Sequence, residues 1–356
     1  MKILLLAGEE SGLIYANRLR ERLAGNEIRG YSDCGFKTAD LAVMGFWAVL
    51  RRIFYFLRVK RTMERLIDTW CPDVVCSIDY PGMNLKLCAY AKSRGIRAVH
   101  VVCPQVWAWK SGRIPKIEAS ADALCCFLPF EPALFRPGFA TFVGHPLAED
   151  FGAARARRTA PDGRRLIALL PGSRLGEIER NLPTMLDAVS RLGVAAEIPA
   201  ANEGAMAAIE RIVAAKGTQN VSVRLHGARE LLLCATAALV ASGTATLEAA
   251  LARCPTVLVY RVSPLLAWFA RRVIKGVRHI GLVNVIWEKS GGGGVSPMPE
   301  LLQEDFTPDR VSALLGSYLD DPAARSAAAD ALDAAVRPLE SGSGTSAFDR
   351  IVALLK

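Results

Sequence analysis

Short apolar runs alternate with amphipathic segments along nearly the whole chain. In the first half, the runs that predict buried strands lie at residues 2–6, 74–78, 98–102, 123–127 and 141–143. In the second half they lie at residues 166–170, 195–198, 221–224, 237–240 and 256–260. Apolar strands separated by helical patterns are typical of parallel sheets that helices cover on both faces. We therefore predict an α/β fold with two doubly wound domains.

The pattern also predicts where the domains divide. Residues 149–165 are rich in Ala, Arg, Gly and Asp with little periodicity, which predicts a linker. After Pro299 the pattern is purely helical, with helix starts at Thr307 and Asp321, each followed by proline, and a last helix over residues 345–355. We predict an N-terminal domain over residues 1–155, a C-terminal domain over 156–305 and closing helices over 306–356 that either pack back or are exchanged in a dimer. The natural ligand site is the crevice at the carboxyl ends of the strands.

Two strand-to-helix loops carry the strongest chemical signal, LLPGSR at 169–174 and SGTATLE at 242–248. Such loops present backbone N–H groups to an anion, and two of them suggest a nucleotide diphosphate site. Arg174 could hold phosphate oxygens bidentately, although a surface charge beside a turn has the same sequence. The expected diphosphate contacts are Ser173, Ser242, Gly243 and Thr244. Helix capping by these residues does not exclude this role, because a cap and a phosphate cradle share the same geometry.

Glu248 lies one turn into the second of these helices. Its carboxylate could accept hydrogen bonds from ribose hydroxyls, or it could only complement the helix dipole.

The composition narrows the class of partner. Lys and Arg outnumber Asp and Glu by 44 to 35, a net charge of +9 that favours anionic partners. Nucleic acid is disfavoured because no long Lys/Arg tract is present and only 7% of the residues are aromatic. Nine cysteines without a CxxC pair indicate reduced thiols in a cytosolic protein, and four scattered histidines predict no metal site.

Neither apolar stretch that could suggest a membrane signal is convincing. Glu9 and Glu10 interrupt the apolar start too early for a signal peptide, so a first buried strand is predicted. The uncharged stretch at residues 231–247 contains Ser242, Gly243 and Thr244 and is too short to span a bilayer.

Residues 44–61 form one unusual amphipathic pattern, MGFWAVLRRIFYFLRVKR. Its bulky apolar side chains cover an arc of roughly 180°, whereas a core-facing stripe needs about 100°. A wide aromatic arc bordered by arginines is typical of a helix in a lipid interface, and a helix packed on two sides is the alternative. The side chains expected to contact membrane or acyl chains are Phe46, Trp47, Leu50, Ile53, Phe54 and Leu57.

Together the motifs resemble those of the lipid-A-disaccharide synthase family. The matching segments run collinearly to about Gln303: GEESG at 8–12, MG at 44–45, SIDYPGMN at 77–84, PQVWAW at 104–109, FLPFE at 127–131, VGHPL at 143–147, the two loops above, YR at 260–261, Asn284 and PELLQ at 299–303. Leu13, Gly82 and the four glycines at 291–294 depart from the family pattern, on the expected acceptor side.

The resemblance implies a GT-B glycosyltransferase with two Rossmann-like domains facing across a cleft. Its reaction would join UDP-2,3-diacylglucosamine to 2,3-diacylglucosamine 1-phosphate with inversion, giving the β-1,6 lipid A disaccharide 1-phosphate and UDP, without a cofactor. It implies a peripheral enzyme on the cytoplasmic face of a Gram-negative inner membrane. Family members form dimers that exchange C-terminal segments, and the helices after Pro299 could do so here.

The resemblance also assigns roles to single residues. An inverting transfer needs a base, and Asp79, at the end of the strand at 74–78, matches the family's proposed base, although Asp is also common in turns. Glu9 and Asn284 match further catalytic positions. Because the chain has no Asp-x-Asp triplet, Arg174, helix N-termini and Arg261 are expected to stabilise the leaving UDP. His145 could be a donor near the sugar or a structural histidine.

Three other functions remain as alternatives. The first is a related GT-B enzyme on another UDP-aminosugar and lipid acceptor, or a UDP-sugar epimerase, which would not need the aromatic helix. The second is a catalytically inactive, membrane-associated homologue, which the intact Asp79, Arg174 and Glu248 argue against. The third is a nucleotide-binding module, which would bind UDP without consuming a donor.

Overall fold

The computed structural model describes residues 1–41, 53–109, 111–155, 165–263, 267–268, 272, 278–340 and 344–356. The chain divides into two compact units. Unit 1 comprises Met1–Pro146 and Ser341–Lys356, so the chain's last helix returns to the N-terminal part. Unit 2 comprises Leu147–Glu340.

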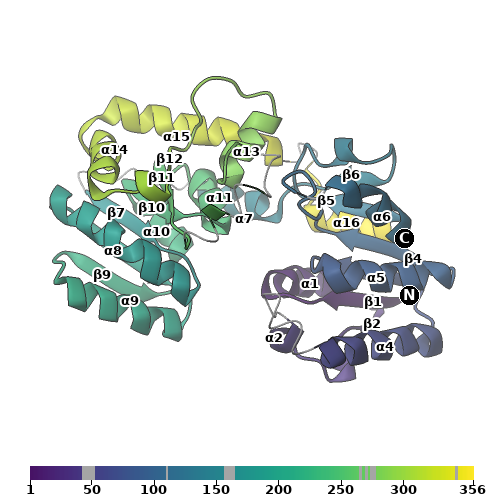
Figure 1. The fold of residues 1–356 in the computed structure, drawn as a ribbon. Helices are drawn as coiled ribbons and strands as arrows, with labels where there is room; N and C mark the ends of the chain where they lie inside the picture. Colours follow the sequence, from purple (N-terminus) through teal and green to yellow (C-terminus); the bar gives the residue numbers. More distant parts are fainter. Residues whose placement is uncertain are drawn as a thin grey trace. The chain divides into compact units, whose positions relative to one another are not determined.

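Unit 1 contains a parallel sheet of six strands in the order β2-β1-β3-β4-β5-β6 (Figure 1). The strands are β1 (Lys2–Ala7), β2 (Glu27–Arg29), β3 (Val74–Ile78), β4 (Arg97–Val101), β5 (Ala123–Cys126) and β6 (Ala140–Phe142). The helices are α1 (Glu10–Arg22), α2 (Thr38–Leu41), α4 (Ile53–Trp70), α5 (Pro81–Ser93), α6 (Ile114–Ser120) and α16 (Ala347–Leu355).

Each face of this sheet has its own core. Alternate residues of β1, such as Ile3 and Leu5, pack with α1 and α16, whereas Leu4 and Leu6 pack with α4 and α5. Both residue sets are buried, which explains why β1 is apolar along its length rather than alternating.

Unit 2 contains a second parallel six-stranded sheet in the order β12-β11-β10-β7-β8-β9 (Figure 1). The strands are β7 (Leu166–Leu170), β8 (Ala195–Ala200), β9 (Val221–Leu225), β10 (Ala237–Ala241), β11 (Thr256–Tyr260) and β12 (Glu300–Leu302). The helices are α7 (Pro146–Arg155), α8 (Leu175–Leu192), α9 (Glu203–Lys216), α10 (Ala228–Cys234), α11 (Thr244–Leu251), α13 (Leu282–Lys289), α14 (Pro308–Asp320) and α15 (Pro322–Val336).

Each sheet has one position where the strand order reverses. In unit 1 this position lies between β1 and β3, and in unit 2 between β7 and β10. The loops that follow these neighbouring strands diverge to opposite sides of the sheet, and parallel α/β sheets bind ligands in the opening that results. The topology alone therefore indicates one candidate ligand site in each unit.

The structure confirms the doubly wound α/β prediction and corrects it at three places. Two three-residue strands, β2 and β12, were not predicted, so the chain after Pro299 is not purely helical. The predicted linker at 149–165 begins as helix, because α7 continues to Arg155. Residues 156–164 lie outside the described part of the chain.

The predicted helix starts in the C-terminal part are confirmed by their caps. The Thr307 side chain accepts a hydrogen bond from the backbone N of Arg310, and Asp321 accepts from Ala323 and Ala324. α16 starts at Ala347, with Ser346 as its cap.

All nine cysteines are free, as predicted. Cys71 and Cys234 are exposed. No helix in the described ranges combines the length and apolarity that crossing a bilayer requires.

Candidate functional site

The loops after β7 and β10 line one pocket of about 490 Å³ in unit 2. Leu170 at the end of β7 pairs with Val240 near the end of β10, so the two loops leave the same edge of the sheet side by side. The pocket lining includes six of the residues predicted for nucleotide binding: Ser173, Arg174, Ser242, Gly243, Thr244 and Glu248. The two loops that the sequence singled out, at 169–174 and 242–248, therefore both line the opening where the strand order reverses.

Glycine is required in both loops for conformational reasons. Gly172 has a φ of 113°, and a Cβ there would lie 2.7 Å from a carboxylate oxygen of Glu177. Gly243 has a φ of 153° and a ψ of −165°, a region that essentially only glycine adopts. These glycines let the backbone itself form the pocket wall.

Two helices begin at the pocket without a side-chain cap. The N-cap of α8 is Arg174, and that of α11 is Gly243. The first N–H groups of each helix lack intrahelical acceptors, and the helix dipole adds partial positive charge. An anion in the pocket therefore meets two favourable helix ends.

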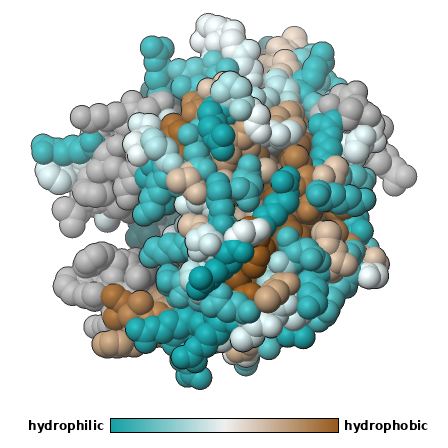
Figure 2. Space-filling view, turned by 90° about the vertical axis from the view of Figure 1, so that its right-hand side faces the viewer, coloured by the Kyte–Doolittle hydropathy of each residue, from teal (hydrophilic) through white to brown (hydrophobic). Residues whose placement is uncertain are grey.

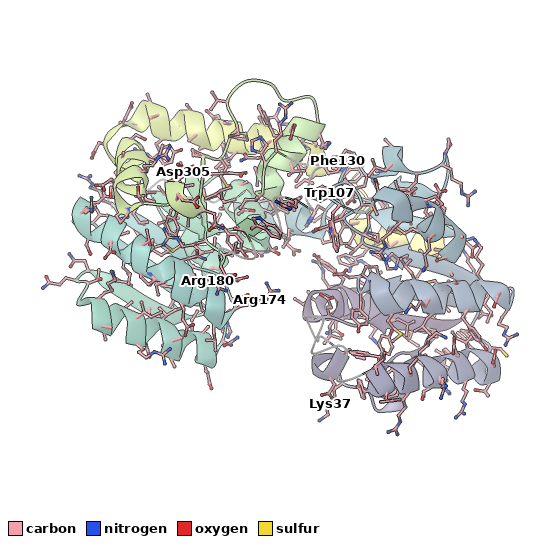
Figure 3. All side chains as sticks on the ribbon, in the orientation of Figure 1. Lys37, Trp107, Phe130, Arg174, Arg180 and Asp305 are labelled. Atoms are coloured by element: carbon pink, nitrogen blue, oxygen red, sulfur yellow. The ribbon has the colours of Figure 1, made fainter. Side chains whose placement is uncertain are left out.

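Arg174 adds a positive charge to this wall. Its Nη1 lies 3.0 Å from Oε1 of Glu177, and its side chain is 62% exposed. Figure 3 shows Arg174 and Arg180 at the N-terminal part of α8. The Glu177 side chain is only 15% exposed, so the guanidinium that it holds presents its open side to the pocket, where it could also contact a phosphate.

Glu248 presents a half-buried carboxylate to the same pocket. Burial raises its pKa, while the positive charge of Arg229 opposes that rise. Arg229 is held in turn by Asp150 at 3.7 Å and by the ring of Phe151 beneath its guanidinium. Glu248 is therefore placed to accept hydrogen bonds from a neutral polyol.

His226 is a pocket residue that the sequence reasoning missed. Its φ is 60°, and its backbone N donates to the oxygen of Ala200 at 2.8 Å, which fixes the turn after β9. The available signal was a histidine–glycine pair between a strand and a helix, at the same sheet edge as the two recognised loops.

Two predicted site residues do not line this pocket. The Arg261 guanidinium donates to the oxygens of Phe306 (2.6 Å) and Thr184 (3.1 Å) and lies over the Phe306 ring. Asn284 is buried and exchanges hydrogen bonds with the backbone of Met298 (2.7 and 3.1 Å). The structure therefore places Arg261 and Asn284 in contacts with other backbone segments rather than in the lining of this pocket.

In unit 1, Glu9 and Asp79 follow the two strands between which the order reverses. Ala7 pairs with Ile78, which brings the two loops together. Asp79 (φ 51°) and Tyr80 (φ 50°) are both left-handed, an uncommon and strained pair. Burial raises the pKa of Asp79, while its hydrogen bond with the backbone of Tyr80 opposes the rise.

Asn84 holds this strained turn in place. Its fully buried amide donates to the oxygens of Ile78 (3.1 Å), Asp79 (2.8 Å) and Leu6 (3.3 Å). Its oxygen accepts from the hydroxyl of Tyr31 at 2.7 Å. One amide thus fastens the carboxyl ends of β1 and β3, a role that the sequence motif alone did not indicate.

His145 is buried and stacks at a tilt on Phe127, with ring centroids 5.6 Å apart. Burial lowers its pKa to about 4, so the ring is neutral at physiological pH.

The N-terminal turns of α4 expose apolar side chains. Phe54 is 82% exposed, and Ile53 and Leu57 are each 43% exposed, although Tyr55 and Phe56 on the same helix pack against the core. Figure 2, which faces unit 1, shows a brown apolar group low on the unit, at the level of α4 in Figure 1. Phe46, Trp47 and Leu50 lie outside the described residues.

Comparison with known proteins gives a consistent result. A family model described as lipid-A-disaccharide synthetase matches residues 3–335. The lipid-A-disaccharide synthase of Anaeromyxobacter sp. (strain K) is 38% identical, covering 93% of this chain and 91% of that protein. The one from Chromohalobacter salexigens is 34% identical, covering 100% and 97%.

Solved structures share the fold at low sequence identity. Acinetobacter baumannii MurG gives a TM-score of 0.59 at 15% identity, covering 99% of this chain and 98% of that one. The calicheamicin glycosyltransferase CalG4 gives 0.57 at 16% identity, with the same coverage. These likenesses concern the architecture of the two sheets.

Proposed function

The chain belongs to the lipid-A-disaccharide synthase family of GT-B glycosyltransferases, and from that premise we propose that the unit 2 pocket binds the UDP of UDP-2,3-diacylglucosamine. The family reaction transfers the diacylglucosamine to 2,3-diacylglucosamine 1-phosphate and releases UDP. The departing pyrophosphate gains negative charge as the glycosidic bond breaks, so a site for this reaction needs fixed donors where that charge develops.

The observation that carries the proposal is the meeting of two glycine loops, two uncapped helix ends and Arg174 in one pocket. The N–H groups of α8 and α11 would bind the two phosphates, and Arg174 would strengthen its contact as the leaving group forms. Glu248 would accept hydrogen bonds from the ribose hydroxyls. In this arrangement the basic groups contact the phosphates and the carboxylate contacts the ribose.

We assign Asp79 as the base that removes the proton from the acceptor hydroxyl. Its burial favours proton uptake relative to an exposed aspartate, which suits a general base. Glu9, on the neighbouring loop, would assist in binding or orienting the acceptor. The acceptor hydroxyl must then come within hydrogen-bond reach of the Asp79 carboxylate.

Membrane contact is proposed for the start of α4. Ile53, Phe54 and Leu57 already lie exposed on unit 1. Phe46, Trp47 and Leu50, one to two turns earlier in the same sequence pattern, would extend that surface. Such a surface would hold the enzyme at the cytoplasmic face of the membrane that carries its acylated substrates.

Dimer formation is proposed through the last helix. α16 packs Phe348 and Ile351 into the unit 1 core of its own chain. An exchanged dimer would place the partner copy's α16 in the same position, with the same contacts.

Titration of UDP against the wild type and Arg174→Ala tests the nucleotide proposal. A charged hydrogen bond is worth about 1.5–3 kcal/mol, so we expect affinity to fall about 10-fold to 100-fold. Arg191→Ala is the matched control, because Arg191 is at the other end of α8 and pairs with Asp309. Equal UDP affinity in wild type and Arg174→Ala would refute the assignment of Arg174.

Product analysis separates the alternative functions. Incubation with donor and acceptor should yield UDP and a disaccharide by mass spectrometry. An inactive homologue or a binding module would bind UDP and leave both substrates unchanged, and an epimerase would alter the donor sugar without joining it to the acceptor.

A further inference from the structure

Three potential metal ligands meet in unit 1, away from the loops assigned above. The sulfurs of Cys103 and Cys126 and a carboxylate oxygen of Glu131 all lie within 4.8 Å of one another. Cys126 is fully buried, and Cys103 and Glu131 are only 4% and 3% exposed. The three residues come from the loop after β4, the end of β5 and the loop after β5.

The backbone directs Cys103 toward Cys126. Val102 precedes it in a left-handed conformation (φ 74°), which is unusual for a β-branched residue, and its N donates to the oxygen of Cys125 at 3.0 Å. Cys126 faces the small core that also contains Cys103, whereas Cys125 belongs to the core on the opposite face. Cys103, in the loop after β4, and Cys126, at the end of β5, therefore lie in the same small core.

The Glu131 carboxylate is held in a fixed orientation. Its Oε1 accepts from Nε1 of Trp107 at 3.1 Å, and its Oε2 accepts from the backbone N of Leu128 at 3.2 Å. Trp107 is itself packed edge-on against Phe130 (Figure 3), with ring centroids 5.7 Å apart. Ligands of protein metal sites are oriented by partners of this kind.

The dimensions agree with a single ion. Zn–S bonds are about 2.3 Å and Zn–O bonds about 2.0–2.2 Å, so two sulfurs on one ion lie at most about 4.6 Å apart. The three ligand atoms, all within 4.8 Å of one another, are close to that limit.

We propose that Cys103, Cys126 and Glu131 form a binding site for one thiophilic divalent cation of the Zn²⁺ class. Two thiolates and a carboxylate supply three ligands, and binding releases the thiol protons to solvent. Thiolate ligands favour Zn²⁺ and Cd²⁺ over Mg²⁺ or Ca²⁺. The ion would tie the ends of β4 and β5 to the segment that contains Trp107.

Titration of the full-length, reduced protein with Cd²⁺ tests this site. Cys71→Ser and Cys234→Ser are included in every sample, because these exposed thiols could bind the probe themselves. We expect one equivalent of Cd²⁺ per chain, an ultraviolet sulfur-to-metal charge-transfer band and a rise in the melting temperature. Cys103→Ala and Cys126→Ala should each abolish all three.

Two variants distinguish Cd²⁺ binding at the proposed site from nonspecific Cd²⁺ binding to any thiol. Cys125→Ala removes a buried cysteine next to Cys126 on the other face and should leave the Cd²⁺ titration unchanged. Trp107→Phe removes the hydrogen bond to Glu131 and should weaken Cd²⁺ binding about 10-fold to 100-fold.

Three results would overturn the proposal. The first is absence of saturable Cd²⁺ binding in the reduced protein that carries only Cys71→Ser and Cys234→Ser. The second is a band that persists in Cys103→Ala. The third is a Cys103–Cys126 disulfide, found by mass spectrometry, as the stable form of protein purified without reductant and handled under metal-replete conditions. If Cys126→Ala does not fold, the Cys103→Ala and Trp107→Phe titrations decide the question.

Discussion

At the scale of single residues, Asp79 illustrates how backbone and chemistry combine. The sequence placed an aspartate after a strand, and the structure adds the left-handed turn and the burial that raises its pKa. Residue spacing in the sequence could not predict the burial of Asp79, because it depends on which side chains close over the turn. A strained, half-buried carboxyl group is characteristic of functional positions.

We predict that Asp79→Asn retains UDP affinity and loses about 10²-fold to 10⁴-fold in turnover, the usual contribution of a general base. Disaccharide formation at saturating substrates measures the turnover. Asp68→Asn, which alters an exposed ion pair with Arg94 in the same unit, is the control. A near-normal rate for Asp79→Asn would remove Asp79 as the base.

Asn84 shows what the sequence could not reveal. The motif contained this asparagine, yet its importance comes from three backbone oxygens that only the folded sheet brings together. Arg261 and Asn284 make the opposite point, since matching a family motif did not disclose that their polar groups support other backbone segments. Residue identity indicates which bonds are possible, and the fold determines which are made.

Asn84→Ala should destabilise the protein by about 1–3 kcal/mol, because buried acceptors lose their donor. Urea unfolding measures this loss. Turnover should fall more than UDP affinity, since the turn that contains Asp79 loses its support. A variant with wild-type stability and turnover would show that Asn84 does not position the turn.

His100 predicts a pH dependence of folding. It is fully buried with its Nδ1 2.7 Å from the Ser77 hydroxyl, and burial lowers its pKa to about 3. Below about pH 6.5 the histidine becomes protonated in the unfolded chain but stays neutral in the folded chain. The free energy of unfolding should therefore fall as the pH drops from 6.5 toward 3.

The free energy of unfolding at pH 7 and pH 5 measures this effect. For one group the decrease is at most about 1.4 kcal/mol per pH unit. His100→Gln should show a smaller decrease than the wild type, although His145 and other groups still titrate. Equal decreases in both proteins would contradict the neutral, buried state of His100.

At the scale of secondary structure, the long apolar strands were predictable and the short edge strands were not. β7 was predicted to the residue, since five apolar residues stand between charged and turn-forming neighbours. β2 and β12 have three residues each, contain charged side chains and occupy sheet edges, so neither hydrophobic period nor length marks them. Their pairing depends on the sheet beside them.

The start of α4 also shows what the sequence pattern could and could not predict. In unit 1 the apolar side chains of its first turns divide into a set that packs, with Tyr55 and Phe56, and a set that does not, with Phe54 and Leu57. The sequence arc included both sets and could not distinguish them.

Replacing Phe54 and Leu57 with Ser should weaken binding to phosphatidylglycerol-containing vesicles by at least about tenfold, because burying each side chain contributes about 1.5–3 kcal/mol. Vesicle flotation measures the bound fraction. Val295→Ser, at a 92% exposed apolar position in unit 2, is the matched control. Unchanged flotation of the double variant would favour packing against another protein surface.

At the scale of the whole molecule, one order of construction appears twice. Each unit has a parallel six-stranded sheet with one reversal of strand order, and the residues proposed for chemistry follow the strands at that reversal. Alternating strands and helices in the sequence predicted this architecture. The sequence offered packing back as one alternative for the closing helices, but not that α16 alone returns to unit 1, because this depends on Phe348 and Ile351 filling one particular core.

A crystal structure with UDP tests the central claim most directly. The account predicts a diphosphate between residues 172–174 and 242–244, with Arg174 turned from Glu177 toward a phosphate oxygen and the ribose near Glu248. UDP bound at any other site on the chain, with these two loops unoccupied, would contradict it.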